Sequence, residues 1–553
     1  MKRLNLFFYQ RNIACSVPLL SLIVSVFLVL SANLSFWKAV GNDLPFSGSS
    51  ILIYASLLGT LVGTYALVLN IVTVRFIGKG LVALVLLIAA VSSYFMDTYG
   101  VHIDRTMLVN VMLTDRREAA DYFTAALFGH LFLFALLPIL VLALLPVVRR
   151  PLKRELFRRL LVCLGCVLLV AVSFGAQYKE LVSLFRNHGE LRNLINPVGP
   201  VRAAVSLARK QWGERDIVVQ PIGTDARLLS HEGKPRLLVL VVGETARAMN
   251  FGLNGYVRDT TPELRRRGVI NFPDVAACGT STAVSLPCMF SMFPRSEYTE
   301  RKGKEYENLV DVLNRAGVQV IWRDNDSGGS KGVADRVGEE KLYNAYVEGI
   351  CNEGGCYDDI LLKDIDEKLA VLEPGRDVLL VLHQKGSHGP SYYLRYPPEF
   401  ASFVPECRSS ELQQCTQEEI INTYDNTILY TDLMLSRVMD LLERYRSRYD
   451  GAMLYVSDHG ESLGEYGLYL HGVPYMVAPD EQTQVPMVMW FDGDSARGFG
   501  VDSDAIRKIS GEQYSHDNLF HSVLGLMGVE TSIYDNSLDI FASCRLTQSR
   551  QEE

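Results

Sequence analysis

Arg236-Leu-Leu-Val-Leu-Val-Val-Gly243 is a short run rich in leucine and valine, and Glu244 and Thr245 follow it directly. A continuous apolar run of this length is typical of a strand buried on both faces of a parallel sheet. Helical patterns, such as the one at residues 418–445, separate it from four similar runs. Those runs lie at residues 318–322, 378–382, 452–456 and 485–491. The alternation predicts a doubly wound α/β domain over residues 236–553.

The expected strands end in polar residues with varied chemistry. Glu244 follows the first strand, His383 the third, and Ser457-Asp-His-Gly-Glu461 the fourth. In sheets of this kind, ligands bind beyond the carboxyl ends of the strands. Glu244, Asp458 and His459 offer oxygen and nitrogen ligands there, and one hydroxyl would complete a four-coordinate site that suits Zn²⁺ and accepts Mn²⁺. Such a cation would lower the pKa of the hydroxyl and make it a nucleophile.

The stretch Cys278-Gly-Thr-Ser-Thr-Ala-Val-Ser-Leu-Pro-Cys288 offers such a hydroxyl. It places Thr280, Ser281 and Thr282 between two cysteines, just before an apolar run that can open a helix. A helix N-terminus presents unpaired N–H groups and a partial positive charge, which suit an anionic phosphoryl group. The alternative is an ordinary Ser/Thr cap on a loop closed by a disulfide. The residue types alone do not choose among the three hydroxyls.

Two further histidines lie in glycine-containing loops. They are His388 in Lys385-Gly-Ser-His-Gly-Pro390 and His471 in Tyr469-Leu-His-Gly-Val-Pro474. We expect them either to complete a second metal site or to bind phosphate oxygens. Each histidine taken singly also fits a surface or supporting role. The repeated occurrence of His, Asp and Glu after the expected strands favours a functional site.

The first third of the chain is apolar. Five runs are long enough to cross a bilayer, at residues 13–33, 50–74, 80–96, 123–148 and 160–177. Arg75 and Lys79 lie between the second and third runs, and six Arg and Lys residues lie between the fourth and fifth. This asymmetry predicts a cytoplasmic N-terminus and an outer location for the chain beyond the fifth span. We expect a membrane domain at residues 1–178 and a bridge at 179–235.

Cysteine spacing indicates the redox compartment of the protein, and net charge argues against nucleic acid as a partner. Six cysteines form the close pairs 278/288, 351/356 and 407/415, which predicts three disulfides in an oxidising compartment, with Cys544 as a free thiol. The formal net charge of −8 provides no basic field for nucleic acid.

A polar loop between the third and fourth spans carries a helical pattern at about residues 105–121. Such a helix would lie along the membrane surface. Asn110, Thr114 and Glu118 repeat every four residues and therefore line one face of it. They suit a polar lipid headgroup, with Glu118 meeting an ammonium. From the residues alone, a plain solvated face is the preferred interpretation.

Several motifs together carry a family resemblance. They are Val242-Gly-Glu-Thr-Ala-Arg247, Cys278-Gly-Thr-Ser-Thr-Ala283, Pro287-Cys-Met-Phe290, His388-Gly-Pro390 and Asp458-His-Gly-Glu461. With the five spans, they resemble the lipid A phosphoethanolamine transferases, the family that includes the enzymes behind polymyxin resistance. That family lies within the alkaline phosphatase/sulfatase superfamily. The resemblance covers nearly the whole chain, whereas Asp-His-Gly-Glu alone would indicate only the superfamily.

The resemblance implies roles for individual residues. It puts the nucleophile at Thr282 and a tightly bound Zn²⁺ on Glu244, Thr282, Asp458 and His459, with a second ion as an open alternative. Its remaining implied roles fall on residues that contact substrate or a second metal. These are His388 and His471 on the substrate side, Lys331 and Glu461 as substrate contacts, and Asn110, Thr114 and Glu118 at the lipid headgroup, which reverses the preference for a solvated face.

The implied reaction moves phosphoethanolamine from phosphatidylethanolamine to a phosphate of lipid A through a phosphothreonine-type intermediate. It would lower surface negative charge and thereby weaken binding of cationic peptides such as polymyxin. The resemblance places the protein in the inner membrane of a Gram-negative bacterium, among membrane lipids and with its catalytic domain in the periplasm. We expect a monomer.

Other functions remain open on the residues. A phosphoglycerol transferase, a membrane phosphodiesterase, or transfer to another glycan such as the lipopolysaccharide core would use the same metal site. A metal-bearing scaffold without turnover is the alternative outside enzymes. Sulfatase activity is disfavoured because neither Cys278-Gly-Thr280 nor Cys288-Met-Phe290 matches the Cys-x-Pro-x-Arg sequence needed for formylglycine.

Overall fold

The computed structural model forms two compact units. The first contains Met1–Leu108 and Phe123–Lys210, and the second contains Val109–Tyr122 and Gln211–Glu553. The segment Val109–Tyr122 therefore groups with the second unit, although the first unit surrounds it in sequence. The structure describes residues 15–48, 50–73, 77–114, 119–148, 150–187, 191–213, 217–231, 233–326 and 328–546.

The first unit is helical. Among the described residues of this unit, four helices are long and apolar enough to span a membrane, and a pair bent by 54° adds a fifth if it counts as one span. The four single helices overlap the second to fifth predicted runs and the first member of the bent pair overlaps the first run, whereas its second member lies outside the predicted runs. The four are α4 (Ile51–Val72), α5 (Gly78–Tyr99), the stretch Ala125–Leu144 and α10 (Leu152–Ala176), and the bent pair is α2 (Val17–Ser31) with α3 (Leu34–Asp43). The chain then continues through α11 (Tyr178–Asn187), α12 (Leu191–Leu194) and α13 (Val198–Gly213).

Two asparagines stabilise the bend between α2 and α3. Asn33 accepts a hydrogen bond from the backbone N of Asn196 at 2.8 Å and donates to its carbonyl at 2.8 Å. Asn196 also donates to the carbonyls of Ala32 and Ala89, at 3.0 and 2.7 Å. Backbone groups freed where a helix breaks need partners inside an apolar unit, and these amides supply them.

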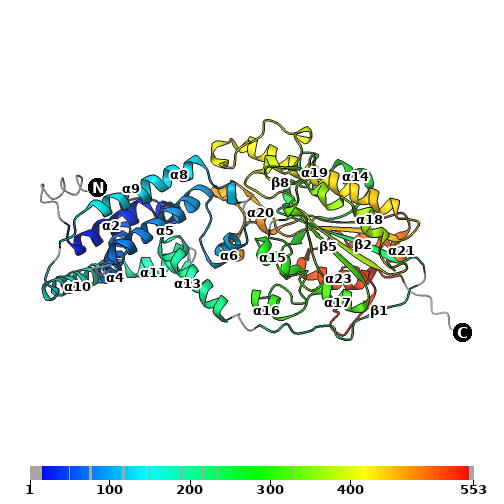
Figure 1. Cartoon of the computed structure of the whole chain (residues 1–553), viewed down its shortest axis with the longest axis horizontal. Coiled ribbons are helices and arrows are strands. Elements are labelled where there is room, and N and C mark those ends of the chain that lie inside the picture. Colours follow the sequence, from blue (N-terminus) through cyan, green and yellow to red (C-terminus); the bar gives the residue numbers. More distant parts are fainter. Residues whose placement is uncertain are drawn as a thin grey trace. The chain divides into compact units, whose positions relative to one another are not determined.

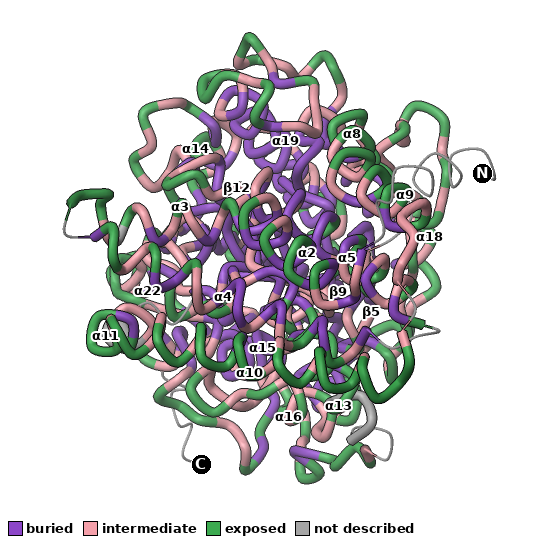
Figure 2. Tube along the Cα trace, turned by 90° about the vertical axis from the view of Figure 1, so that its left-hand side faces the viewer, coloured by how far each residue is buried: buried purple, intermediate pink, exposed green. Residues whose placement is uncertain are grey.

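The outward faces of these helices suit lipid. Only 6% of the most apolar 18-residue stretch of α10 is buried, and exposed residues along this helix are coloured green in Figure 2. The stretch Ala125–Leu144 comprises α8 (Ala125–Leu131), a π-helical segment η1 (Phe132–Leu136) and α9 (Leu137–Leu144). The wider π turn lies just before Pro138, which has no N–H to continue the ladder.

The second unit is built on a seven-stranded sheet of order β3-β13-β10-β2-β9-β5-β6. The strands are β2 (Arg236–Gly243), β3 (Ile270–Phe272), β5 (Gln319–Asp324), β6 (Glu340–Lys341), β9 (Val378–His383), β10 (Asp450–Ser457) and β13 (Met487–Phe491). Every residue of β2 is buried, and β2 pairs in parallel with β9 and β10. The α/β fold predicted from this run is confirmed.

One strand runs against the expectation. β13 pairs antiparallel with both β10 and β3, although its sequence resembles the parallel strands. After β10 the chain passes only through short elements, β11 (Ser462–Leu463), β12 (Tyr469–Leu470) and α20 (Asp480–Thr483). A parallel neighbour needs a connection, usually a helix, that returns along the sheet to the end where the first strand began. Because none of these elements makes that connection, the chain re-enters the sheet in the reverse direction.

Helices cover both faces of the sheet (Figure 1). One face carries α14 (Pro262–Arg267), α18 (Ile365–Ala370) and α19 (Gln417–Arg444), and the other carries α15 (Thr282–Met289), α17 (Leu309–Ala316) and α23 (Leu519–Leu526). Shorter helices are α16 (Glu300–Glu305), α21 (Ser495–Gly498) and α22 (Ser503–Ile509). Small strand pairs are β1 (Arg227–Leu228) with β15 (Val529–Glu530), β4 (Val275–Ala276) with β14 (Tyr514–Ser515), and β7 (Cys351–Asn352) with β8 (Gly355–Cys356).

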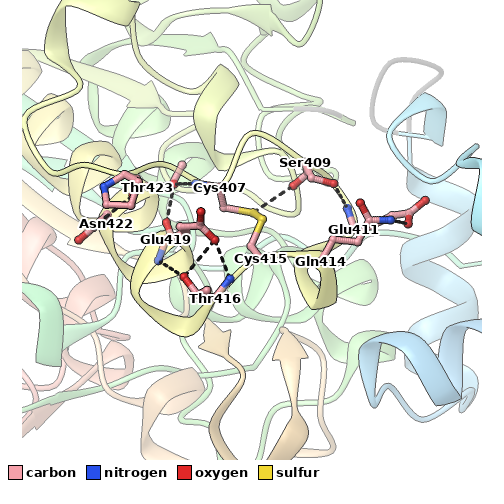
Figure 3. The surroundings of a disulfide bond; sticks show 10 residues. Cys407, Ser409, Glu411, Gln414, Cys415, Thr416, Glu419, Asn422 and Thr423 are labelled. Atoms are coloured by element: carbon pink, nitrogen blue, oxygen red, sulfur yellow. Dashed lines mark hydrogen bonds between the residues drawn. A yellow bond between two sulfur atoms is a disulfide. The ribbon is translucent and has the colours of Figure 1, made fainter.

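The three predicted disulfides are present, joining Cys278 to Cys288, Cys351 to Cys356 and Cys407 to Cys415. The last lies just before α19 (Figure 3). There Thr416 and Glu419 form a capping box, in which Thr416 N donates to the Glu419 carboxylate at 2.7 Å. Cys544 is a buried free thiol.

Candidate active site

Parallel pairing brings two polar strand exits together. Ser457, the last residue of β10, is opposite Gly243, the last residue of β2, so Asp458 and Glu244 leave the same edge of the sheet. Both side chains are fully buried. The loop after β9 also lies close to Glu244. Gly386 in this loop has φ of +51°, and a Cβ there would lie 2.6 Å from the Glu244 carbonyl oxygen. A residue without a side chain is therefore needed at position 386.

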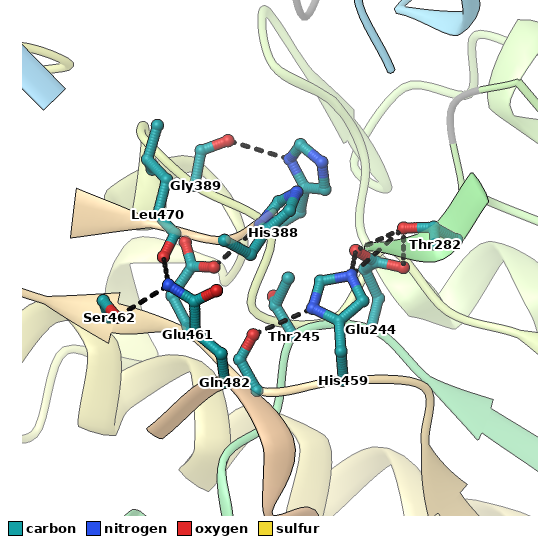
Figure 4. A network of polar contacts seen from close by, with 12 residues as sticks. Glu244, Thr245, Thr282, His388, Gly389, His459, Glu461, Ser462, Leu470 and Gln482 are labelled. Atoms are coloured by element: carbon teal, nitrogen blue, oxygen red, sulfur yellow. Dashed lines mark hydrogen bonds and ion pairs between the residues drawn. The ribbon is translucent and has the colours of Figure 1, made fainter. Parts of the chain in front are cut away.

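Thr282 begins α15 and faces the Glu244 carboxylate (Figure 4). Its Oγ1 donates to Glu244, with both carboxylate oxygens at 3.1 Å, and lies 3.3 Å from His459 Nε2. The neighbouring Thr280 hydroxyl instead donates to the Val473 carbonyl at 2.7 Å. Of the two threonines, the structure thus brings Thr282 to the carboxylates.

The side chains around Thr282 fit a divalent cation. Glu244, Asp458 and His459 each offer a ligand atom, and these atoms all lie within 4.8 Å of one another. His459 Nδ1 donates to the Gly460 carbonyl at 2.8 Å, so Nε2 is the nitrogen on the side of Asp458, whose Oδ2 is 3.3 Å away. Metal-binding histidines are commonly oriented by such a bond from the second nitrogen. Among the described residues, Asp458 Oδ2 has no hydrogen-bond partner. A set of buried oxygen and nitrogen ligands with an unsatisfied oxygen suits Zn²⁺.

The charges in this site need compensation. Burial and the nearby Asp458 and Asp326 carboxylates raise the pKa of Glu244 well above its usual value. Burial also raises the pKa of Asp458, to about 6. Burial, and then the neighbouring His471, lower the pKa of His459 well below its usual value, which keeps this ring neutral and able to act as a ligand.

A second group of ligand atoms shares Glu244. Glu244, Asp326 and His388 also offer atoms that lie within 4.8 Å of one another. His388 Nδ1 donates to the Gly389 carbonyl at 2.8 Å, which repeats the arrangement of His459 and Gly460. Asp326 was not among the predicted site residues. It lies two residues after β5, and applying the strand-end rule to the second expected strand would have found it.

Lys331 and His383 place positive charge beside Asp326. Lys331 Nζ lies 3.3 Å from Asp326 Oδ2, and the residue has a left-handed backbone with φ of 52°. Burial alone would lower the pKa of His383, but the Asp324 carboxylate at 2.9 Å and the charges of Asp326 and Asp458 raise it to about 9. These two cations offset part of the buried negative charge.

His471 lies among the other histidines and is held by Glu461. Its ring centroid is 4.5 Å from that of His459 and 5.5 Å from that of His388. Glu461 Oε2 accepts from His471 Nδ1 at 2.8 Å, and Oε1 accepts from the Tyr392 hydroxyl at 2.6 Å. Both oxygens of Glu461 are therefore used inside the protein. Its predicted contact with substrate stays a prediction, and no sequence motif pointed to Tyr392.

The segment predicted as a surface helix is helical over α6 (Arg105–Leu113), and residues 119 and 120 are again helical. Thr114 follows it, and its N donates to the Asn110 carbonyl at 2.9 Å. Asn110 Nδ2 would lie 3.5 Å from a Cβ at Gly472, next to His471. Glu118 lies outside the described residues.

The same segment reaches the loop of His388. Asp121 lies 3.6 Å from Arg395, and Arg395 donates to the His388 carbonyl at 2.7 Å. Segment Val109–Tyr122 is therefore linked to both histidine loops of its own unit.

The fold and this site together define a sulfatase-like α/β domain preceded by membrane helices. The Sulfatase family model matches residues 236–529, and the model described as Phosphoethanolamine transferase EptA/EptB matches residues 61–212. Phosphoethanolamine transferase EptA of Escherichia coli K12 is 39% identical over 534 residues, 95% of this chain and 96% of the relative. The chain belongs to the phosphoethanolamine transferase family.

Two further comparisons support this assignment. Phosphatidylethanolamine transferase Mcr-1 of Escherichia coli is 39% identical, covering 88% of this chain and 91% of the relative. The structure of the integral membrane protein lipooligosaccharide phosphoethanolamine transferase A from Neisseria meningitidis superposes with a TM-score of 0.91 at 38% identity. It covers 95% of this chain and 98% of that one.

Proposed function

We propose that the protein transfers phosphoethanolamine from phosphatidylethanolamine to a phosphate of lipid A, through a covalent intermediate on Thr282. The observation that carries this proposal is the contact of the Thr282 hydroxyl with Glu244, at 3.1 Å, inside a group of buried ligand atoms. The names of the family members support the transferred group. The lipooligosaccharide in the name of the Neisseria relative supports an acceptor of the lipid A class.

Zn²⁺ is the cation that best fits the site, held by Glu244, Thr282, Asp458 and His459. When bound, it would lower the pKa of the Thr282 hydroxyl and offset the crowded carboxylates. A second, weaker ion would be held by Glu244, Asp326 and His388, which offer the other set of converging ligand atoms.

The protein residues carry the transfer in two steps. In the first, Thr282 Oγ loses its proton and forms a bond to the donor phosphorus, the bond between phosphorus and the diacylglycerol oxygen breaks, and the diacylglycerol oxygen leaves with a proton. His388 or His471 steadies the phosphoryl oxygens or gives a proton to the leaving oxygen. In the second, a phosphate oxygen of the acceptor bonds to the same phosphorus and Thr282 Oγ leaves. Splitting the transfer lets donor and acceptor use one site in turn.

Other residues would hold the substrates. Lys331 supplies positive charge for a phosphoryl group, because its ammonium lies beside Asp326 and Glu244 in the same buried cluster. Glu461 acts from the His471 side of the site. Asn110 and Thr114, together with Glu118, would bind the ethanolamine headgroup. This assignment is supported by the proximity of Asn110 to Gly472 and of Asp121 to Arg395.

The cellular setting follows from charge and cysteines. We infer an inner-membrane protein of a Gram-negative bacterium with its N-terminus in the cytoplasm and its second unit in the periplasm. The Arg and Lys clusters between the expected spans and the three disulfides support this orientation. Capping acceptor phosphates with an ammonium group would reduce surface negative charge and protect the cell against polymyxin.

Mass spectrometry tests the proposal. Lipid A from producing cells is expected to gain the mass of phosphoethanolamine, and Thr282→Ala is expected to abolish that gain. The intact protein, trapped with donor alone, should carry the same added mass. A phosphoglycerol mass would instead favour the phosphoglycerol transferase alternative. An unmodified lipid A together with a modified core glycan would move the acceptor to the lipopolysaccharide core.

A further inference from the structure

Three side chains, of which Tyr392 and Glu461 are buried, form a continuous hydrogen-bonded line that ends at His471, whose side chain is 16% exposed. The Tyr392 hydroxyl donates to Glu461 Oε1 at 2.6 Å, and Glu461 Oε2 accepts from His471 Nδ1 at 2.8 Å. Tyr392 is 1% exposed and Glu461 is fully buried. The line therefore joins the loop after β9, which carries Tyr392, to the loop after β10, which carries the other two residues.

The hydrogen bonds define which nitrogen of His471 carries a proton. A carboxylate only accepts, so both the phenol and the imidazole Nδ1 point hydrogens at Glu461. Nε2 is then the ring nitrogen that does not bond to Glu461, and the His471 ring lies 4.5 Å from that of His459. Burial and the Glu461 carboxylate raise the pKa of Tyr392 well above its usual value, so the phenol stays a donor.

The middle of the line, Glu461, and one of its ends, Tyr392, are anchored in the fold. The backbone of Glu461 donates to the Glu481 carbonyl at 2.7 Å and accepts from Arg247 at 3.2 Å. The ring of Tyr392 packs edge-on against Tyr424 of α19, with centroids 5.5 Å apart. The Tyr424 hydroxyl donates to the carbonyl of Thr245 at 2.6 Å, one residue beyond Glu244. Tyr392 is thus held in place independently of Glu461.

We propose that Tyr392 is a positioning residue for the transfer, which acts through Glu461 to fix the tautomer and direction of the His471 ring. This inference rests on the proposed function, because it assumes that His471 serves the transfer. Without the phenol, Glu461 Oε1 loses its donor inside a buried site, and the carboxylate is free to turn. The His471 ring then loses its single defined orientation. Orienting partners of functional histidines typically contribute about 10- to 100-fold.

The test compares Tyr392→Phe with a matched control. Tyr396→Phe is the control because Tyr396 is equally buried, lies four residues further along the same loop and donates to another carboxylate, that of Glu406. Turnover of fluorescent phosphatidylethanolamine is measured with the full-length protein in detergent. Tyr392→Phe is expected to lower kcat about tenfold or more with little change in KM, whereas Tyr396→Phe stays within about twofold of wild type. Melting temperatures of the two variants should fall by similar amounts.

A double-mutant cycle shows whether Tyr392 acts through His471. In a His471→Ala background, Tyr392→Phe should have no further effect on kcat, since the ring it positions is gone. Glu461→Gln, which keeps the shape of the side chain, should likewise have no further effect on kcat in the His471→Ala background. Equal kcat losses in the Tyr392→Phe and Tyr396→Phe variants would overturn the inference. So would a Tyr392→Phe loss that is undiminished without His471. Failure of the wild type to transfer phosphoethanolamine would instead refute the proposed function.

Discussion

The two halves of the site each contain a fully buried carboxyl group, Asp458 in one and Glu461 in the other, but differ in whether its oxygens have hydrogen-bond partners. In the half that contains Thr282, Asp458 Oδ2 has no hydrogen-bond partner among the described residues, and ligand atoms of Glu244, Asp458 and His459 converge. In the other half, both oxygens of Glu461 accept hydrogen bonds from protein donors. Buried polar atoms normally have hydrogen-bond partners. The half with the unpaired Asp458 oxygen therefore fits a cation, whereas the half with Glu461 uses its oxygens to hold the His471 ring.

The largest expected effect comes from the first half. Thr282→Ala removes the oxygen that we propose attacks the donor phosphorus, and turnover of phosphatidylethanolamine should fall by about 10⁴-fold or more. Thr280→Val is the control, because the Thr280 hydroxyl bonds to the Val473 carbonyl and not to Glu244. It should lose less than about tenfold, as expected for one neutral hydrogen bond. Comparable losses in the two variants would remove the distinction between the hydroxyls.

Zinc content should differ between a variant in the half that contains Thr282 and a variant in the half that contains Glu461. Asp458→Asn is expected to weaken Zn²⁺ binding by more than about 100-fold, since it removes a ligand where a supporting contact alone costs about 10- to 100-fold. Glu461→Gln should keep the wild-type zinc content, because Glu461 belongs to the half that is satisfied by protein donors. Elemental analysis after dialysis measures both. Loss of zinc from Glu461→Gln would show that the halves are not distinct.

A smaller effect is expected at the second group of ligand atoms. Asp326→Asn should remove the weaker of two binding steps in a zinc titration of metal-stripped protein, lowering that affinity about 10- to 100-fold, and leave the tight step in place. Asp359→Asn serves as the control, because Asp359 pairs with Arg437 and Tyr430 outside both groups. A single binding step in the wild type would mean that only the first group holds an ion.

The smallest effect is expected away from both halves. Replacing Cys351 and Cys356 by serine opens a ring with a sequence separation of five, so the free energy of unfolding should fall by only about 2 kcal/mol. Turnover should change less than about twofold, as neither cysteine contacts Thr282 or His471. Thermal unfolding and donor turnover of the double variant test this. A large loss of turnover would instead connect this disulfide to the His388 loop through Arg395, which donates to the Gly354 carbonyl at 3.0 Å.

Local patterns predicted the elements of this protein well. The run at Arg236–Gly243 is a buried strand, and residues at its end and at the end of β10 converge as expected. Periodicity failed for strand direction, which depends on the path of the connection between the strands. β13 has the composition of a parallel strand and runs antiparallel. The first span likewise contains a bend that is stabilised by Asn196, more than 160 residues away in sequence.

The amino-acid order was sufficient for composition-driven features: apolar spans, buried strands, close cysteine pairs and the motif that marks the family. These depend on residues that are near one another in the chain. The pairings of Thr282 with Glu244, of Asp326 with His388, and of Tyr392 with Glu461 emerged only from the folded molecule. Each joins loops from different strands, and a hydrogen bond or a ligand group depends on distances of a few ångströms that sheet register and backbone turns create.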